Sequence, residues 1–223
     1  MARTVTHTDA GTLFGDTPFN EVAASRSFVS IVFELISERE PTTQELVLFE
    51  LILNLSIDHG PDAPSAQATI ERAQTGEHMG SAVGEGIAEI NDVHGGAQNA
   101  LMEILFQIDS GTATPASIVT DYKAAGKRLP GYGHRIYSTD PRTTQIFAAL
   151  EGHDLATAYR KNVEAIQTEI ISQLGKQLPI NIDGAIAVVL ASFGWPASYG
   201  SAVFIIARAA GLCGHYINNR KTS

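Results

Sequence analysis

The sequence holds a single cysteine in 223 residues and few charged side chains. One cysteine cannot form an internal disulfide, which excludes a disulfide-stabilised scaffold and favours a reducing, cytoplasmic location. Charged residues make up 17% of the chain and hydrophobic residues 44%, so intrinsic disorder is excluded. Lysine and arginine number 15 against 24 aspartates and glutamates, a formal charge of −9. This balance argues against nucleic acid or an anionic membrane as a partner.

Several familiar segments and motifs are also missing. Residues 1–19 lack the apolar stretch of a signal peptide. The longest apolar stretch, residues 202–213, is interrupted by Arg208 and is too short to cross a bilayer. No GxxxxGK[ST], HExxH or paired CxxC motif occurs, so we expect neither a P-loop nor a metal site. Apolar and polar residues alternate nowhere for long, which argues against a large sheet.

The chain instead consists of apolar helical segments punctuated by Gly and Pro. Residues 28–36 carry a stripe of helical period, and Thr42 with Glu45 fits a capping box. Residues 46–57 are apolar nearly all round, which predicts a helix buried in a core or against a partner. Further helices are expected at residues 65–74, 80–90, 97–107, 115–125, 143–150, 155–174, 183–193 and 198–218. The pattern predicts one all-α domain over residues 1–223 with about ten helices, with residues 1–25 as an extended arm, and a homo-oligomer.

Histidines lie in two loops between these helices, where catalytic groups are often held. His59 follows the apolar helix in Asp58-His59-Gly60-Pro61. It could donate a hydrogen bond to an anionic substrate, or simply end the helix. His94 precedes Gly95-Gly96 and a helix start, which either lets a ligand approach backbone N–H groups or forms an ordinary turn.

The most distinctive segment is a basic loop. Five of the fifteen basic residues lie within twenty positions: Lys123, Lys127, Arg128, Arg135 and Arg142. In a chain of charge −9, this concentration favours a local anion site over a merely solvated loop. The glycines of Gly131-Tyr132-Gly133 would let the backbone wrap a ligand.

Two charged residues stand in apolar surroundings. Asp183 opens an apolar helix and could be its N-cap, or desolvation could raise its pKa and make it a base. Arg208 lies in an apolar stretch and, if buried, needs an anionic partner from the protein or a ligand. Histidines, a carboxylate and arginines together suit enolisation beside a carbonyl and the making or breaking of a C–C bond.

Four segments resemble, in order, the active-site motifs of the citrate synthase superfamily: residues 93–99 (VHGGAQN), 130–134 (PGYGH), 140–142 (DPR) and 181–184 (NIDG). The resemblance runs from residue 46 to the C-terminus. It implies a helical, dimeric or larger protein without a metal or redox cofactor, with an active site near the subunit interface. The size and the DHGP motif resemble citryl-CoA lyase and the C-terminal module of ATP-citrate lyase. His94, however, stands where citrate synthases have their first catalytic histidine and lyase modules tend to have Phe.

The resemblance implies a role for each of these residues. Asp183 would take a methyl proton from acetyl-CoA or return it, His94 would hydrogen-bond the thioester oxygen, and His134 would act on the oxaloacetate carbonyl or the citryl hydroxyl. His59, Arg142 and Arg208 would bind the carboxylates of oxaloacetate or citrate. Coenzyme A, a substrate rather than a tightly bound cofactor, would be held by Lys127, Arg128, Leu129, Gly131, Tyr132, Gly133 and Arg135.

The resemblance favours a lyase that cleaves citryl-CoA to acetyl-CoA and oxaloacetate. A compact citrate or methylcitrate synthase is the alternative. A second alternative is a CoA- or dicarboxylate-binding subunit whose partner activates citrate with ATP. Citrate synthases lend a C-terminal arginine across the dimer interface, and Arg220 could take that part here. Cys213 has no evident catalytic role.

Overall fold

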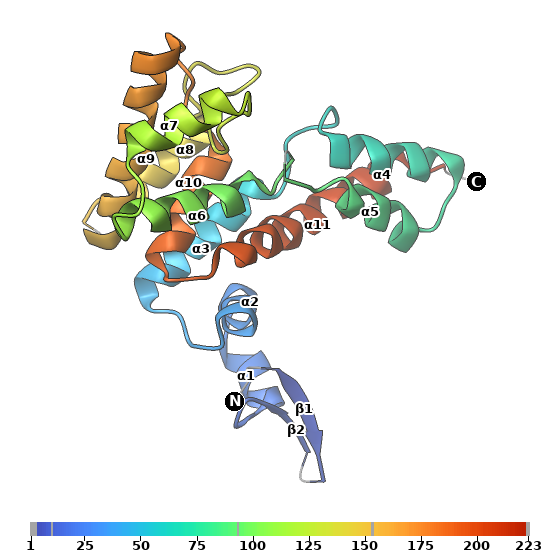
Figure 1. The fold of residues 1–223 in the computed structure, drawn as a ribbon. Helices are drawn as coiled ribbons and strands as arrows, with labels where there is room; N and C mark the ends of the chain where they lie inside the picture. Colours follow the sequence, from blue (N-terminus) through green and yellow to red (C-terminus); the bar gives the residue numbers. More distant parts are fainter. Residues whose placement is uncertain (1–3, 10, 93, 153, 222–223) are drawn as a thin grey trace. The chain divides into compact units, whose positions relative to one another are not determined.

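The computed structural model describes residues 4–9, 11–92, 94–152 and 154–221 and is mostly helical (Figure 1). Its internal contacts divide it into two compact units, Met1–Leu51 and Ile52–Ser223, and the boundary falls inside α3 (Thr43–Ser56). The single domain over residues 1–223 and the arm over residues 1–25 stay predictions. Val93, in the first of the four motifs, lies outside the described residues.

The first unit begins with a small antiparallel sheet that the sequence did not predict. Its elements are β1 (Val5–Thr8), β2 (Gly11–Phe14) and β3 (Thr17–Pro18), in that order, followed by α1 (Phe19–Ser25). Val5 pairs with Phe14, and Thr8 with Gly11. All four residues of β1 are exposed, so no alternation of apolar and polar residues could mark it.

Two helices complete the first unit. Ser27 caps α2 (Phe28–Ser37) by accepting a hydrogen bond from the backbone of Ser30. The predicted capping box of α3 is confirmed, since Glu45 N donates to Thr42 Oγ1 (3.2 Å) and Thr42 N donates to Glu45 Oε2 (2.8 Å).

The second unit is built of helices. They are α4 (Pro64–Thr75), α5 (Met79–Ala88), α6 (Ala97–Asp109), α7 (Pro115–Ala124), α8 (Pro141–Ala149), α9 (Asp154–Leu174), α10 (Ile182–Ser192), the 3-10 helix η1 (Ala197–Tyr199) and α11 (Gly200–Asn219). Every helix predicted from the sequence is present, with its ends displaced by a few residues. The largest displacement at a start is three residues, in α3, which begins at Thr43 directly after the capping Thr42; α8 begins at Pro141, two residues early, because Asp140 caps it.

Helix α10 carries Asp183, and helix α11 carries Arg208. The body of α10 is buried from Gly184 to Ala191 and packs against α6, α8 and α9. Helix α11, red in Figure 1, packs against α4 and α5. By length and composition alone, Ala197–Asn219 could cross a membrane; buried core helices share that property, and Arg208 in its middle is only 1% exposed.

Candidate active site

The PGYGH loop is tied to the start of α10 by backbone hydrogen bonds. Gly133 N donates to the carbonyl oxygen of Pro179 (2.7 Å), and Asn181 N donates to that of Gly131 (3.0 Å). The Asn181 side chain also donates to the carbonyl oxygen of Gly133 (3.0 Å). Gly131 has a φ of +80°, which glycine adopts without strain. The loop therefore delivers His134 to the N-terminal end of α10.

Asn181, and not Asp183, caps α10. Asn181 Oδ1 accepts the N–H of Gly184 (3.2 Å), so the N-cap interpretation of Asp183 is wrong and its carboxylate is left for another task. Asp183 Oδ1 is buried and has no hydrogen-bond partner among the described residues. Burial raises the pKa of Asp183 to about 6, although the nearby charges of Arg142 and Arg208 oppose the shift. A carboxyl group in this state can both accept and donate a proton near neutral pH.

Asp140 fixes the guanidinium of Arg142. The Asp140 side chain is fully buried, and its Oδ1 accepts from Arg142 N and Nε (3.0 Å each) while Oδ2 accepts from Nη2 (2.8 Å). Oδ2 also accepts the N–H of Ile182 (3.1 Å), at the start of α10. Burial alone would raise the pKa of Asp140, but the hydrogen bonds from Arg142 hold it below its usual value. Asp140 thus joins Arg142 to the residue before Asp183.

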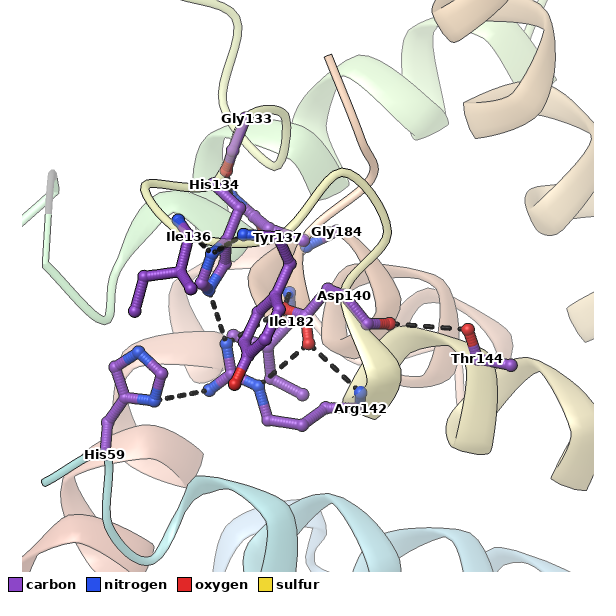
Figure 2. Close-up of polar contacts among 11 residues, drawn as sticks. His59, Gly133, His134, Ile136, Tyr137, Asp140, Arg142, Thr144, Ile182 and Gly184 are labelled. Carbon is purple, nitrogen blue, oxygen red and sulfur yellow. Dashed lines mark hydrogen bonds and ion pairs between the residues drawn. The ribbon is translucent and has the colours of Figure 1, made fainter. Parts of the chain in front are cut away.

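His59, His134 and Arg142 form a contact cluster, shown in Figure 2. Arg142 Nη1 lies 3.4 Å from His59 Nδ1, and Nη2 lies 3.5 Å from His134 Nε2. The two imidazole rings stand edge to face, with centroids 5.9 Å apart. Burial and the charge of Arg142 lower the pKa of both histidines, which favours their neutral forms.

The hydrogen bonds of His134 define its tautomer. Its Nδ1 accepts the backbone N–H groups of Ile136 and Tyr137 (3.1 Å each). A neutral ring that accepts at Nδ1 carries its proton on Nε2, which lies on the Arg142 side. Because guanidinium nitrogens only donate, Arg142 and the Nε2–H of His134 present donors on the same side, an arrangement that suits an anionic ligand.

Arg208 is a buried cation. It donates from Nε to the carbonyl oxygen of Ser56 (3.1 Å) and from Nη1 to Ser65 Oγ (3.2 Å), and it lies 4.6 Å from the centre of the Phe204 ring. Burial lowers its pKa, and among the described residues no carboxylate forms an ion pair with it. A buried guanidinium of this kind is stabilised by an anionic ligand.

Ser65 links Arg208 to His94. The Ser65 hydroxyl, fully buried in the first turn of α4, lies 3.1 Å from His94 Nε2. Burial and then the positive charges of Arg208, His59 and Arg135 lower the pKa of His94. Sequence reasoning missed Ser65, since the only signal for it is a serine directly after Pro64 at a helix start.

The residues proposed to hold coenzyme A fall into two groups. Leu129 and Tyr132 are buried, and the Tyr132 hydroxyl donates to the carbonyl oxygen of Val163 (2.8 Å), so only their backbones are available to a ligand. Lys127, Arg128 and Arg135 are exposed. No side-chain hydrogen bond joins Lys127 or Arg128 to another described residue, and their role stays a prediction.

The chain is similar to known proteins of one family. Residues 2–223 match the family described as citrate synthase, C-terminal domain. The structure superimposes on citryl-CoA lyase from Hydrogenobacter thermophilus with a TM-score of 0.90 and 29% identity, covering 100% of this chain and 88% of that one. A citrate synthase of Deinococcus radiodurans is 30% identical over 82% of this chain and 50% of its own length. A probable ATP-citrate synthase of Dictyostelium discoideum is 26% identical over 93% of this chain and 36% of its own length. The chain thus spans between about a third and a half of these two relatives.

Proposed function

Because the chain belongs to the citrate synthase family, we propose that it makes or breaks the carbon–carbon bond between a coenzyme A thioester and oxaloacetate, and that it acts as a citryl-CoA lyase. The similarity to a citryl-CoA lyase over the whole chain supports the lyase direction. The observation that carries the proposal is Asp183, a buried carboxyl group whose Oδ1 has no hydrogen-bond partner in the described part of the chain and whose pKa is raised to about 6 despite the charges of Arg142 and Arg208.

The substrate carboxylates would bind to three side chains. Arg142 holds its guanidinium against Asp140, which leaves Nη1 directed toward His59. Arg208 offers a buried positive charge without a carboxylate partner among the described residues. Oxaloacetate carries two carboxylates and the citryl group keeps two beside its thioester, so two arginines and His59 match the charge of either substrate.

Asp183 would act on the carbon next to the thioester, and His94 on the thioester oxygen. In cleavage, the C–C bond breaks and leaves the enolate of acetyl-CoA, and His94 stabilises the negative oxygen by a hydrogen bond. The protonated Asp183 then gives its proton to the carbon and forms the methyl group. In condensation the ionised Asp183 takes that proton, and a pKa of about 6 makes both forms available near neutral pH.

His134 would act at the other carbon. In cleavage the hydroxyl proton leaves to water, and in condensation water returns it, while the Nε2–H of His134, whose Nδ1 accepts two backbone N–H groups, donates a hydrogen bond to the reacting oxygen. That oxygen is the tertiary hydroxyl of the citryl group in cleavage and the ketone of oxaloacetate in condensation. Arg142 beside it favours negative charge at the same position.

A compact citrate synthase is the alternative, and His94 favours it. A histidine, rather than an apolar ring, stands between Ser65 and Phe204, and a citrate synthase is among the relatives. A synthase differs in hydrolysing the citryl thioester. A third arrangement, in which a partner activates citrate with ATP, is supported by the probable ATP-citrate synthase relative, of which this chain spans 36%.

One pair of assays separates these reactions. Given citryl-CoA, a lyase forms oxaloacetate, which malate dehydrogenase and NADH detect. Given acetyl-CoA and oxaloacetate, a synthase releases free thiol, while a lyase does not. The variant Asp183→Asn should lose both activities. Inactivity of the wild type in both assays would exclude both enzymes.

The assembly and the location are part of the proposal. In the first unit, Phe28 (73% exposed), Leu35 (46%) and Val47 (59%) present apolar surface on α2 and α3. Such surface supports a homodimer or a larger homo-oligomer. Sedimentation of the wild type and of Phe28→Ser tests it, since the variant should shift toward monomer. The one cysteine, Cys213, is free, which supports a reducing, cytoplasmic location.

A further inference from the structure

Helix α11 contacts three consecutive residues, at the end of α3 and directly after it. Arg208 Nε donates to the carbonyl oxygen of Ser56 (3.1 Å). About one turn later Gly211 lies so close to the carbonyl oxygen of Ile57 that no side chain would fit there. Positions three apart share one face of a helix, so these contacts run along a single stripe of α11.

His215 continues the stripe one turn further. Its Nε2 lies 2.9 Å from Asp58 Oδ1, and its side chain is only 14% exposed. Asp58 directly precedes His59 in the chain, so holding the Asp58 carboxylate fixes the backbone from which the His59 ring projects. Burial alone would raise the pKa of Asp58, but hydrogen bonds, first of all the one from His215, hold it below its usual value, so the carboxylate stays charged and keeps its bond to His215.

His59 needs such support. It is exposed, and within the described residues its ring makes one polar contact, the 3.4 Å approach to Arg142 Nη1, at the long end for a hydrogen bond. We propose that His215 is a positioning residue that, through Asp58, holds the ring of His59 against Arg142. This inference rests on the proposed function, in which His59 and Arg142 bind the substrate carboxylates.

Three variants test this role. His215→Ala removes the bond to Asp58, and His215→Gln keeps a donor. Tyr216→Phe is the matched control, because it removes one side-chain hydrogen bond of the same helix, to the carbonyl oxygen of Glu77 (2.8 Å). In the ligand-free protein, the NMR signal of the His59 ring should move in His215→Ala, move less in His215→Gln and stay in Tyr216→Phe.

Kinetics supply the second readout. In condensation of acetyl-CoA with oxaloacetate, His215→Ala should raise the KM for oxaloacetate about tenfold, the scale of one hydrogen bond to a charged group. It should leave kcat and the KM for acetyl-CoA unchanged. His215→Gln should keep the KM for oxaloacetate close to the wild-type value. If His215→Ala does not fold, Asp58→Ala should show the same separation of KM from kcat.

A double variant decides whether His215 acts through His59. In the His59→Ala background, His215→Ala should change the KM for oxaloacetate no further, and an additive effect would overturn the inference. The NMR readout is independent of turnover. An unmoved His59 signal in His215→Ala refutes the inference at any level of activity. A moved signal in a protein that catalyses neither reaction refutes the proposed function instead and leaves the placement of His59 supported.

Discussion

Gly184 lies directly against the backbone of Gly131: a methyl group on Gly184 would come within 2.7 Å of the Gly131 carbonyl oxygen. The same oxygen accepts the N–H of Asn181. This contact sets the distance between the loop that carries His134 and the helix that carries Asp183. The two proposed proton-transfer groups therefore depend on a position where only glycine fits.

Gly184→Ala should lower activity without removing any catalytic side chain. The new methyl group must push the loop away from α10, and displacements on the scale of 1 Å reduce rates by about a hundredfold. We expect kcat for condensation or cleavage to fall on that scale. Overpacking should also lower the free energy of unfolding by about 1–3 kcal/mol.

Gly84→Ala is the matched control for this change. Gly84 is also helical, but a Cβ there would meet nothing within 4 Å, so this variant should keep full activity and gain about 0.5–1 kcal/mol from helix propensity. Equal kcat values for the two variants would contradict the role given to the contact.

Arg208→Met should bring no marked loss of stability while ligand binding disappears. Replacing a buried charge with an apolar side chain of similar length removes the cost of desolvating the charge, which offsets the loss of its hydrogen bonds to Ser56 and Ser65. In the wild type, oxaloacetate at about 100 times its Kd should stabilise the fold by roughly 2.7 kcal/mol. Thermal unfolding with and without oxaloacetate should show this shift in the wild type and none in Arg208→Met.

Arg160→Met controls for the loss of an arginine over an aromatic ring. Arg160 lies 5.0 Å from the centre of the Phe147 ring and pairs with Glu164 (2.8 Å), outside the proposed site. This variant should keep the shift caused by oxaloacetate. A wild-type shift that survives in Arg208→Met would remove Arg208 from the carboxylate site.

The sequence predicted the helices well because their signals are local. Thr42 with Glu45, and Thr114 before Pro115, mark helix starts within four residues, and both caps are present. Strand β1 was not predicted because it is exposed on both faces. Its pairing with β2 defines it as a strand, and its own sequence carries no pattern.

The site shows the same division between local and distant signals. A buried Arg208 could be predicted from its apolar neighbours in sequence. The cap of α10 could not be assigned uniquely, because Asn181 and Asp183 are both good capping residues and the tertiary contacts of Asn181 with the PGYGH loop decide between them. Ser65 lies 143 residues from Arg208, and no local pattern joins the two.

Asp183→Asn should stabilise the protein above pH 6. An unfolded aspartate has a pKa of about 3.9, whereas Asp183 in the folded protein has one of about 6. The folded state therefore binds the proton more tightly, and stability falls as pH rises from about 4 to 6. Above that range ionisation costs roughly 2–3 kcal/mol.

The gain in Asp183→Asn should therefore be full at pH 8 and vanish near pH 4. Denaturant unfolding at the two pH values measures it. Asp121→Asn, at an exposed position of α7, is the control for the substitution itself. A gain in Asp183→Asn that is independent of pH would mean that the carboxyl group is not the cause.

His94→Gln should separate catalysis from binding. If His94 stabilises the enol oxygen, its loss removes an interaction made mainly in the transition state, so kcat should fall by about 10²–10³ while the KM for oxaloacetate changes little.

Ser65→Ala, which removes the hydroxyl beside His94 Nε2, should lower kcat less, by roughly tenfold. Ser192→Ala is the control, because the one hydrogen bond of the Ser192 side chain within the described residues is to the carbonyl oxygen of Val189 in its own helix (2.6 Å). If His94→Gln instead raised the KM for oxaloacetate at constant kcat, His94 would belong to the carboxylate site, and the enol oxygen would need another donor.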